Sequence, residues 1–447
     1  MRTIRTVAGM LLGGLFCLTT QAATQAKDVT QFTLKNGMTM LVLEDHSIPN
    51  ANMYLFWKVG SRNEHPGITG LSHFFEHMMF NGSKKYGPKM FDRTMEAAGG
   101  SNNAYTTNDV TVYTDWFPSD ALETIFDLEA DRIQYLDIDP DMVESERGVV
   151  ASERSTGLEN SNFRAIYEEV LNAAFRAHPY SWPVIGHESD IANWSMDDLR
   201  SYHQTYYAPN NAVVVVVGDV KTVEVKKLAQ TYFEPIPAQT PPRPIHTVEP
   251  EQKGERRAYL QKASVTSPNI LMAFHVPAAT DPDYYPLVLL SDILSNGNSS
   301  RLQSSLVFEQ QLATDVFTDM SPSLDPYLFF VYATAAPEVT AEALEQGMIA
   351  QINAVMEKGV SADELQKVKN QRQVNFYREL ATINGKANAL GDYATFFGDY
   401  TKMFGAAAEY DKVSLDDIKR VANTYLRRAN RTVGVLDATE DSHENDR

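Results

Sequence analysis

The stretch from Gly70 to Gly82, GLSHFFEHMMFNG, carries His73 and His77 with Glu76 directly before the second histidine. Residues four apart lie one turn apart on the same face of a helix, so both imidazoles can reach one metal ion. Glu76 flanks that face and is suited to hold a metal-bound water. The alternative is a core helix that happens to carry polar residues. The apolar neighbours and the flanking glycines favour a buried metal helix.

A catalytic zinc site uses three protein ligands and keeps one position open, so the two histidines need a carboxylate from elsewhere in the chain. Cysteine does not supply a ligand, because the single cysteine, Cys17, lies in an N-terminal segment that we expect to be removed. Any metal must therefore sit on histidine and carboxylate.

The first 26 residues have the order of an export signal: a basic start, an apolar run from Val7 to Leu18, and small residues with cleavage predicted after Ala22 or Ala26. A buried N-terminal helix is the alternative, but the pattern is not amphipathic. The apolar run is too short to span a membrane. We therefore predict a signal peptide at residues 1–26 and a periplasmic protein.

The chain is acidic, with a formal net charge of −19. Cleavage of the signal would remove Arg2 and Arg5 and make the charge more negative by two. Such a charge argues against nucleic acid or an anionic membrane surface as the main partner. It is compatible with basic or neutral ligands and with simple solubility.

The length of 447 residues exceeds one ordinary core, and helices alternate with strands in hairpins around Asn36-Gly37 and Asn108-Asp109. This mixture predicts an α+β fold of two domains, each a mostly antiparallel sheet backed by helices. A stretch dense in proline and charge is the predicted linker. The expected division is an N-terminal domain at 27–235, a linker at 236–255, a C-terminal domain at 256–440 and a tail at 441–447.

The two sides of this linker resemble each other. SMDDLRSYHQTYYAPNNAVVVVVGD, starting at Ser195, aligns without a gap to SLDDIKRVANTYLRRANRTVGVLDA, starting at Ser414. Both read as a capped helix, a loop and a buried strand. A duplicated domain explains the similarity. Chance similarity of two amphipathic helices is the alternative, since Ser-x-Asp-Asp caps are common.

With its downstream context, the motif H-x-x-E-H resembles the insulinase/pitrilysin family of zinc peptidases, which includes the mitochondrial processing peptidases. Members carry a zinc-ligand glutamate about 76 residues after the second histidine and another glutamate seven residues before that one. Glu153 and Glu146, in ESERGVVASER, stand at these positions. The N-A-x-T strand of the family is matched by Asn103, Ala104, Tyr105 and Thr106.

The resemblance implies that His73, His77 and Glu153 bind one zinc ion per chain and that Glu76 is the general base of a zinc endopeptidase. Glu146 would orient a ligand or substrate, although by sequence alone it fits a solvent-facing helix residue equally well. A peptide or unfolded segment would enter a closed chamber and add as a strand along residues 103–106, a stretch that also fits an ordinary hairpin strand.

The second domain departs from the family pattern. Many members carry an arginine and, seven residues later, a tyrosine that help to bind the substrate. The matching stretch, LVFEQQLATDV, has Val307 and Thr314 at these positions. The chain therefore resembles the zinc-bearing subunit of a heterodimer, similar to the beta subunit of mitochondrial processing peptidase, whose partner carries the pair. A homodimer or a monomer in which other residues do this work stays open.

Two further functions stay open. A binding or assembly subunit could keep a structural zinc, but such a site has no need of Glu76 and normally closes with a fourth ligand. Hydrolysis of a non-peptide ester or amide at the same metal is the other alternative.

Overall fold

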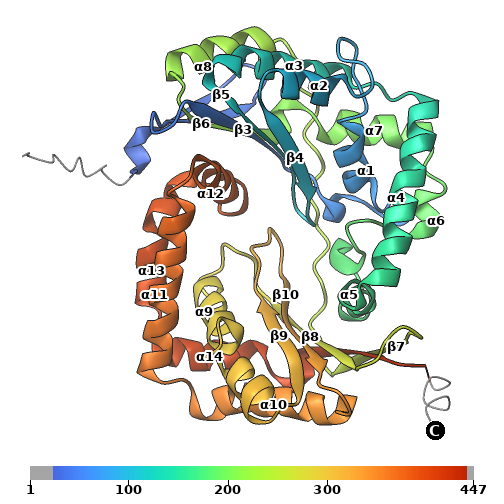
Figure 1. The fold of residues 1–447 in the computed structure, drawn as a ribbon, viewed down its shortest axis with the longest axis vertical. Coiled ribbons are helices and arrows are strands. Elements are labelled where there is room, and N and C mark those ends of the chain that lie inside the picture. The colour runs from blue at the N-terminus through green and yellow to red at the C-terminus, as the bar shows by residue number, and fades with distance from the viewer. Residues whose placement is uncertain (1–23, 440–447) are drawn as a thin grey trace, which may run out of the picture.

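The computed structural model describes residues 24–439, which form two halves with one β-sheet each (Figure 1). Residues 1–23 of the predicted signal peptide and the predicted tail lie outside the described residues. The first sheet has the order β1-β2-β6-β3-β5-β4, and its neighbours are antiparallel except for β2 and β6. The strands are β1 (Val29–Thr33), β2 (Thr39–Glu44), β3 (Asn50–Trp57), β4 (Ser101–Thr106), β5 (Thr111–Pro118) and β6 (Ala212–Gly218).

The second sheet repeats this arrangement. Its order, β7-β11-β8-β10-β9, matches β2-β6-β3-β5-β4, including the one parallel pair, β7 and β11. The prediction of an α+β fold with two similar, mostly antiparallel domains is confirmed. The strands are β7 (Arg256–Gln261), β8 (Asn269–Val276), β9 (Ala313–Asp319), β10 (Tyr327–Ala335) and β11 (Arg431–Asp437).

The repeated sequence folds alike in both halves. The Oγ atoms of Ser195 and Ser414 each accept a hydrogen bond from a backbone N–H of the first helical turn at 3.1 Å. After each helix an asparagine, Asn211 or Asn430, donates to a backbone carbonyl at 2.8 Å and so fixes the turn into the strand. The same caps and turns therefore begin and end the helix of each repeat. These helices are α7 (Met196–Tyr206) and α14 (Leu415–Tyr425).

Each sheet has one face covered by helices of its own half and the other by a helix from the opposite half (Figure 1). From the C-terminal half, α12 (Ile383–Phe396) packs on β3 and β6, whereas α5 (Asn162–Ala174) packs on β7, β8 and β11. A Cβ atom on Gly391 of α12 would overlap the ring of Phe56 on β3. The glycine thus permits a close approach of helix and sheet, and the halves interlock.

The other α-helices are on the outer faces or along the sides of the two halves (Figure 1). Within the described residues they are α1 (Leu71–Met78), α2 (Met90–Ala97), α3 (Leu122–Tyr135), α4 (Pro140–Asn160), α6 (Glu188–Ile191), α8 (Thr222–Leu228), α9 (Tyr284–Ser295), α10 (Ala341–Lys358), α11 (Ala362–Glu379) and α13 (Ala406–Lys412).

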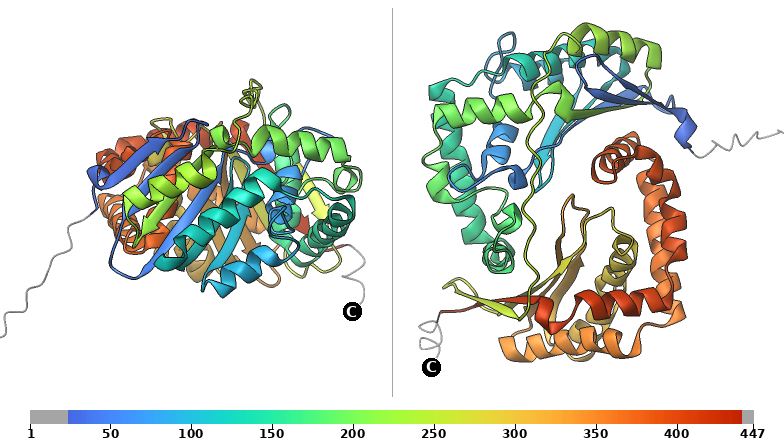
Figure 2. Two further views of the ribbon diagram at one scale, coloured as in Figure 1. Left: turned by 90° about the horizontal axis from the view of Figure 1, so that it is seen from above. Right: turned by 180° about the vertical axis from the view of Figure 1, so that it is seen from behind.

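A long extended segment joins the two halves. Residues 237–253 form neither helix nor strand, and the view from behind shows this part of the chain running from one half to the other (Figure 2). Among residues 24–439, the structure has no helix that is both long and apolar enough to cross a membrane.

Candidate metal centre

The helix α1 carries the H-x-x-E-H motif and is anchored at its first turn. Gly70 precedes it in the left-handed region, at φ 90°, and a Cβ atom there would lie 2.5 Å from the carbonyl oxygen of Ile185. The carboxylate of Glu64 accepts hydrogen bonds from the N–H groups of Gly70 and Ser72, both at 2.8 Å. Glu64 therefore satisfies backbone donors that a helix N-terminus would otherwise leave without partners.

Burial raises the pKa of Glu64 to about 8, against the effect of the two N–H donors. No periodic pattern in the sequence indicates a role for this residue, because a lone acid six positions before a glycine belongs to no helix or strand pattern. Only the folded chain brings it under α1.

One face of α1 is apolar and fixed in the core. Phe74 packs against Trp194 with ring centroids 4.9 Å apart, and Phe75 stacks on Tyr202 at 6.0 Å. The hydroxyl of Tyr113 donates to the carbonyl of Phe75 at 3.0 Å. The opposite face, with both histidines and Glu76, is thereby held in one orientation.

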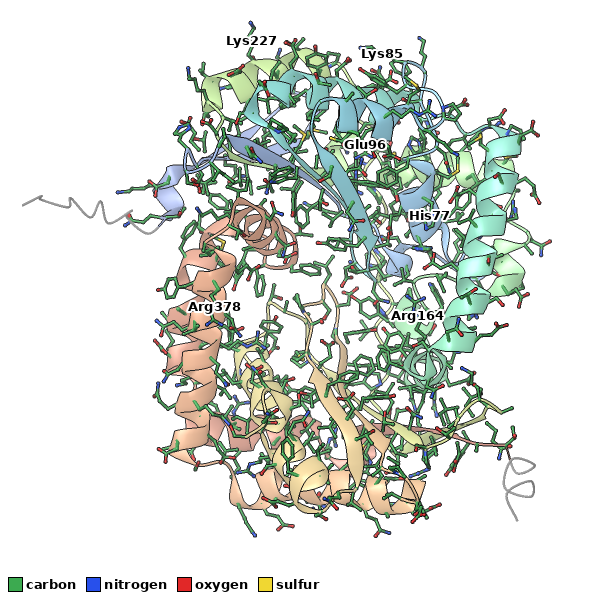
Figure 3. The ribbon with its side chains drawn as sticks, in the orientation of Figure 1. His77, Lys85, Glu96, Arg164, Lys227 and Arg378 are labelled. Carbon is green, nitrogen blue, oxygen red and sulfur yellow. The ribbon has the colours of Figure 1, made fainter. Side chains whose placement is uncertain are left out.

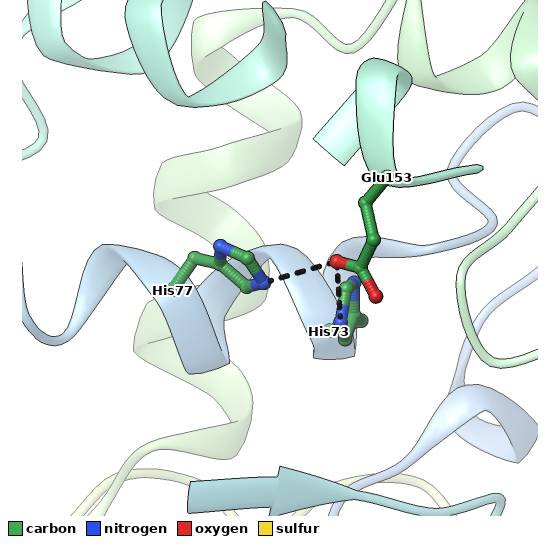
Figure 4. A group of neighbouring side chains, drawn as sticks. All are labelled: His73, His77 and Glu153. Atoms are coloured by element: carbon green, nitrogen blue, oxygen red, sulfur yellow. Dashed lines mark ion pairs between the residues drawn. The ribbon is translucent and has the colours of Figure 1, made fainter. Parts of the chain in front are cut away.

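The long helix α4 brings Glu153 to that face. Its Oε2 lies 3.6 Å from Nε2 of His73 and 3.6 Å from Nε2 of His77 (Figure 4). The three donor atoms all lie within 4.8 Å of one another. Two donors each about 2.1 Å from a tetrahedral ion are about 3.4 Å apart, so two nitrogens and one carboxylate oxygen at this spacing fit zinc with a position left open.

Glu146 lies on α4 seven residues, or about two helical turns, before Glu153, and it contacts the Nδ1 side of the His77 ring. Its Oε1 lies 2.7 Å from Nδ1 of His77, and its Oε2 accepts from the side-chain amide of Asn81 at 2.6 Å. A carboxylate on Nδ1 leaves Nε2 free to face a metal. Figure 3 shows the labelled His77 between α4 and β4. Asn81 was not predicted from the sequence, although its i+4 spacing from His77 places it on the same helix face.

The two histidines have opposite electrostatic environments. Burial, followed by the neighbouring His77, lowers the pKa of His73 to about 4. Burial acts in the same direction on His77, but hydrogen bonds to Glu146 and Glu153 outweigh it and raise the pKa of His77 to about 9. A zinc ion binding at this site would displace a proton from His77.

Glu76 does not belong to the group of three residues that could bind a metal ion, His73, His77 and Glu153. Its Oε2 accepts a hydrogen bond from Oγ1 of Thr106 at 2.6 Å, and burial raises its pKa. Thr106 ends β4, which is the edge strand of its sheet. On the same strand, Asn103 and Tyr105 are exposed and Ala104 is half-buried. The expected base and the expected substrate strand thus touch each other.

The second half has no comparable site among the described residues. Its helix α9 carries Asp292, which forms an ion pair with Arg372. Val307 is half-buried against the core, and Thr314 is an exposed residue of β9. At the positions of the family's arginine and tyrosine, this chain therefore has an apolar residue that packs against the core and a threonine whose hydroxyl is on the surface.

A small cavity of about 260 Å³ opens at the metal centre. It is lined by His73, Glu153 and Thr106 and also by Arg164 and Tyr167 of α5. Nη1 of Arg164 lies 4.0 Å from Oε1 of Glu153, and Figure 3 labels Arg164 near the start of α5. A positive group thus borders the space next to the expected zinc ligands.

Comparison with known proteins agrees with this geometry. Residues 39–188 match the family described as insulinase (peptidase family M16), and residues 193–372 match the peptidase M16 inactive domain. The zinc protease PqqE of Helicobacter pylori is 32% identical over 90% of this chain and 91% of its own length. The mitochondrial-processing peptidase subunit beta of Lentinula edodes is 25% identical over 88% of this chain and 86% of its own.

Among solved structures, the crystal structure of a protease from Helicobacter pylori superposes with a TM-score of 0.89 at 31% identity. The match covers 92% of this chain and 99% of that one. The likeness therefore extends over both halves and is not confined to the metal helix.

Proposed function

The chain belongs to the insulinase family of peptidases, family M16, and on that basis we propose that it is a zinc-dependent endopeptidase that hydrolyses peptides or unfolded segments. The proposal depends mainly on the position of Glu76. Its carboxylate lies beside the metal-donor residues His73, His77 and Glu153 but is not one of the grouped donors and instead accepts a hydrogen bond from a threonine. A purely structural zinc site has no use for such a carboxylate and normally closes with a fourth protein ligand.

The contacts support the following roles. His73, His77 and Glu153 hold one zinc ion, which when bound supplies a Lewis acid and lowers the pKa of water. Glu76 takes the proton of the attacking water and delivers it to the leaving amine. Thr106 orients the Glu76 carboxylate by its hydroxyl. Glu146 keeps His77 turned toward the metal.

The substrate adds as a strand along β4. This strand has a free edge, so its backbone N–H and C=O groups can pair with an extended peptide whatever the sequence of that peptide. Because Thr106 touches Glu76, a peptide paired with residues 103–106 would pass the metal centre. Residues of both halves line the cavity beside Tyr105 and Thr107, which supports a restriction to extended chains.

We further propose that the chain works with a partner of the same family in the periplasm. Val307 and Thr314 supply neither the charge nor the phenol of the arginine and tyrosine pair, and one relative is itself a subunit, the mitochondrial-processing peptidase subunit beta. The partner would bring that pair to the site. Weak peptidase activity of the purified chain alone, with a large increase on adding the partner, is the expected result; full activity alone would exclude the need for a partner.

The test of the enzyme proposal compares the wild type with Glu76→Gln and with Glu96→Gln, an exposed glutamate of α2 that serves as the matched control. Zinc content and cleavage of unfolded protein are measured on each, with and without the co-purified partner. We expect zinc in all three proteins. The wild type and Glu96→Gln should cleave the unfolded protein, whereas Glu76→Gln should not. Zinc in all three with no cleavage even with the partner would favour a binding or assembly subunit.

A further inference from the structure

A second cavity of about 260 Å³ lies within the C-terminal half, between the helices α9, α11, α12 and α13. It is separate from the cavity at the metal centre, which is lined by residues of the N-terminal half. Figure 1 shows α11, α12 and α13 on the side of the molecule opposite to α4. Five aromatic rings line this second cavity: Tyr284, Phe376, Tyr393, Phe397 and Tyr410.

The rings form an apolar wall that is only partly covered. Tyr393 stacks on Phe397 with ring centroids 4.6 Å apart, and Phe397 meets Tyr284 edge to face at 5.7 Å. Phe376, Tyr393 and Tyr410 are half-buried, so they keep surface that a ligand could cover. An aromatic face attracts a cation, and covering it also removes apolar surface from water. Such a wall therefore suits an organic cation.

Two carboxyl groups in the same wall have no counter-ion. Asp392 accepts a hydrogen bond from the side-chain amide of Asn388 at 3.0 Å, and Glu379 is exposed. Within residues 24–439, neither carboxyl forms an ion pair with a lysine, an arginine or a histidine. Burial, followed by the nearby Glu379, raises the pKa of Asp392 to about 7. A cation beside both carboxyls would offset their mutual repulsion.

The two basic residues of the cavity are already engaged by other groups. Nη2 of Arg372 donates to Oδ1 of Asp292 at 3.0 Å. Nζ of Lys369 donates to two backbone carbonyl oxygens at 2.8 and 2.7 Å. An anionic ligand would have to compete with these contacts and would also be repelled by the two unpaired carboxyls. The charges of the cavity therefore favour a cation.

Side chains of α12 connect this cavity to the edge strand β4. The amide of Asn388 donates to Asp392, and its carbonyl oxygen accepts from the hydroxyl of Tyr105 at 3.3 Å. Tyr105 precedes Thr106 on β4, and the hydroxyl of Thr106 binds Glu76. A ligand that fixes the position of Asp392 would therefore also fix a contact of the strand.

We propose that this cavity binds a small organic amine with a ring-sized apolar body and that the bound amine stabilises β4 through Asn388. The ammonium group would donate to Asp392 and Glu379, since charge-assisted hydrogen bonds are the stronger ones. The apolar body would lie against the aromatic wall. This inference goes beyond the proposed peptidase function and holds whether or not the chain cleaves peptides.

The test compares three probes that share one body and differ in charge. Phenethylamine is a cation, phenethyl alcohol is neutral and phenylacetate is an anion. Each is titrated against the purified chain by isothermal titration calorimetry at a pH above the pKa of Asp392, so that this carboxyl is ionised. We expect phenethylamine to bind at least about tenfold tighter than phenethyl alcohol, and phenylacetate not to bind.

Substitutions locate the bound amine. Asp392→Asn should remove most of the preference for phenethylamine, whereas Glu357→Gln, at an exposed position of α10 outside the cavity, should keep it. Tyr410→Leu removes a ring of this cavity and should weaken binding of the amine. Phe317→Leu should not, because Phe317 lines the neighbouring cavity between the two halves and not this one. Unchanged unfolding temperatures show that the variants are folded.

Hydrogen–deuterium exchange of the wild type locates the ligand without any substitution. Saturating phenethylamine should slow exchange in α11, α12 and α13 and also in β4, and the effect on β4 should be lost in Asn388→Leu. No binding of phenethylamine, equal or tighter binding of either other probe, or unchanged exchange in β4 would overturn the proposal. Loss of binding in Phe317→Leu but not in Tyr410→Leu would do the same. None of these measurements depends on cleavage, so failure of the amine site is distinguishable from failure of the peptidase proposal.

Discussion

Removal of the Glu146 carboxylate should weaken zinc binding without removing a zinc ligand. Glu146 contacts His77 at 2.7 Å, and its side chain is only 14% exposed, so water replaces it poorly. A hydrogen bond to a charged group contributes about 1.5–3 kcal/mol, which corresponds to a loss of roughly 10- to 150-fold in zinc affinity for Glu146→Ala. Glu146→Gln keeps a neutral acceptor for His77 and should lose only about fivefold, since a neutral hydrogen bond supplies part of that energy.

The assay is competition for zinc against a chromogenic chelator at one neutral pH, with thermal unfolding of the zinc-free chains as the check on folding. Glu144→Ala is the matched control, because Glu144 lies on the same helix with its side chain 78% exposed. We expect the order wild type and Glu144→Ala, then Glu146→Gln, then Glu146→Ala. If Glu146→Ala binds zinc as tightly as the control, the contact with Glu146 does not orient His77, and the reasoning fails.

Two other substitutions test the base and the interlocked halves. Thr106→Val keeps the shape of the side chain but removes the hydrogen bond to the proposed base, so kcat/KM should fall about tenfold with zinc affinity unchanged. Thr424→Val on α14, whose hydroxyl bonds only to a carbonyl of its own helix, should have no such effect. Gly391→Ala places a methyl group against a ring of β3 and should lower the free energy of unfolding by about 1–3 kcal/mol in denaturant titrations. Gly405→Ala, where a Cβ meets no atom within 4 Å, should be nearly neutral, and equal effects at the two glycines would contradict the close packing of α12.

Short-range sequence patterns predicted the helices and turns whose structure depends on residues close together in the chain. The metal helix, the hairpins around Gly37 and Asp109, and the repeat at Ser195 and Ser414 all follow from caps, turns and periodicity that lie within a dozen residues. The stretch TVEVKKLAQTYF is helical, but its second part, Ala229–Phe233, is a π-helix. That change leaves no sign in the hydrophobic pattern.

Contacts between distant segments could not be predicted in this way. The packing of α5 and α12 on the sheet of the opposite half depends on which faces meet in space. An amphipathic pattern predicts that one face of a helix is buried, but it does not identify the element against which that face packs. The support of α1 by Glu64 is missed for the same reason. Among the motif residues, Thr106 was expected on the substrate strand, but its bond to Glu76 required the strand and the helix to be placed together.

The exchange of helices also explains what the C-terminal half contributes without metal ligands of its own. Through β9 and β10 it supplies Phe317 and Phe330 to the wall of a cavity of about 590 Å³ between the two halves, and through α12 it supplies Phe396. Asn388 of α12 accepts from the hydroxyl of Tyr105 at 3.3 Å and so touches the edge strand itself. A half that lacks zinc ligands therefore still borders the path along β4. Because α5 carries Phe163 and Tyr167 beside the sheet of the opposite half, a shift between the halves would change the cavity and the metal centre together.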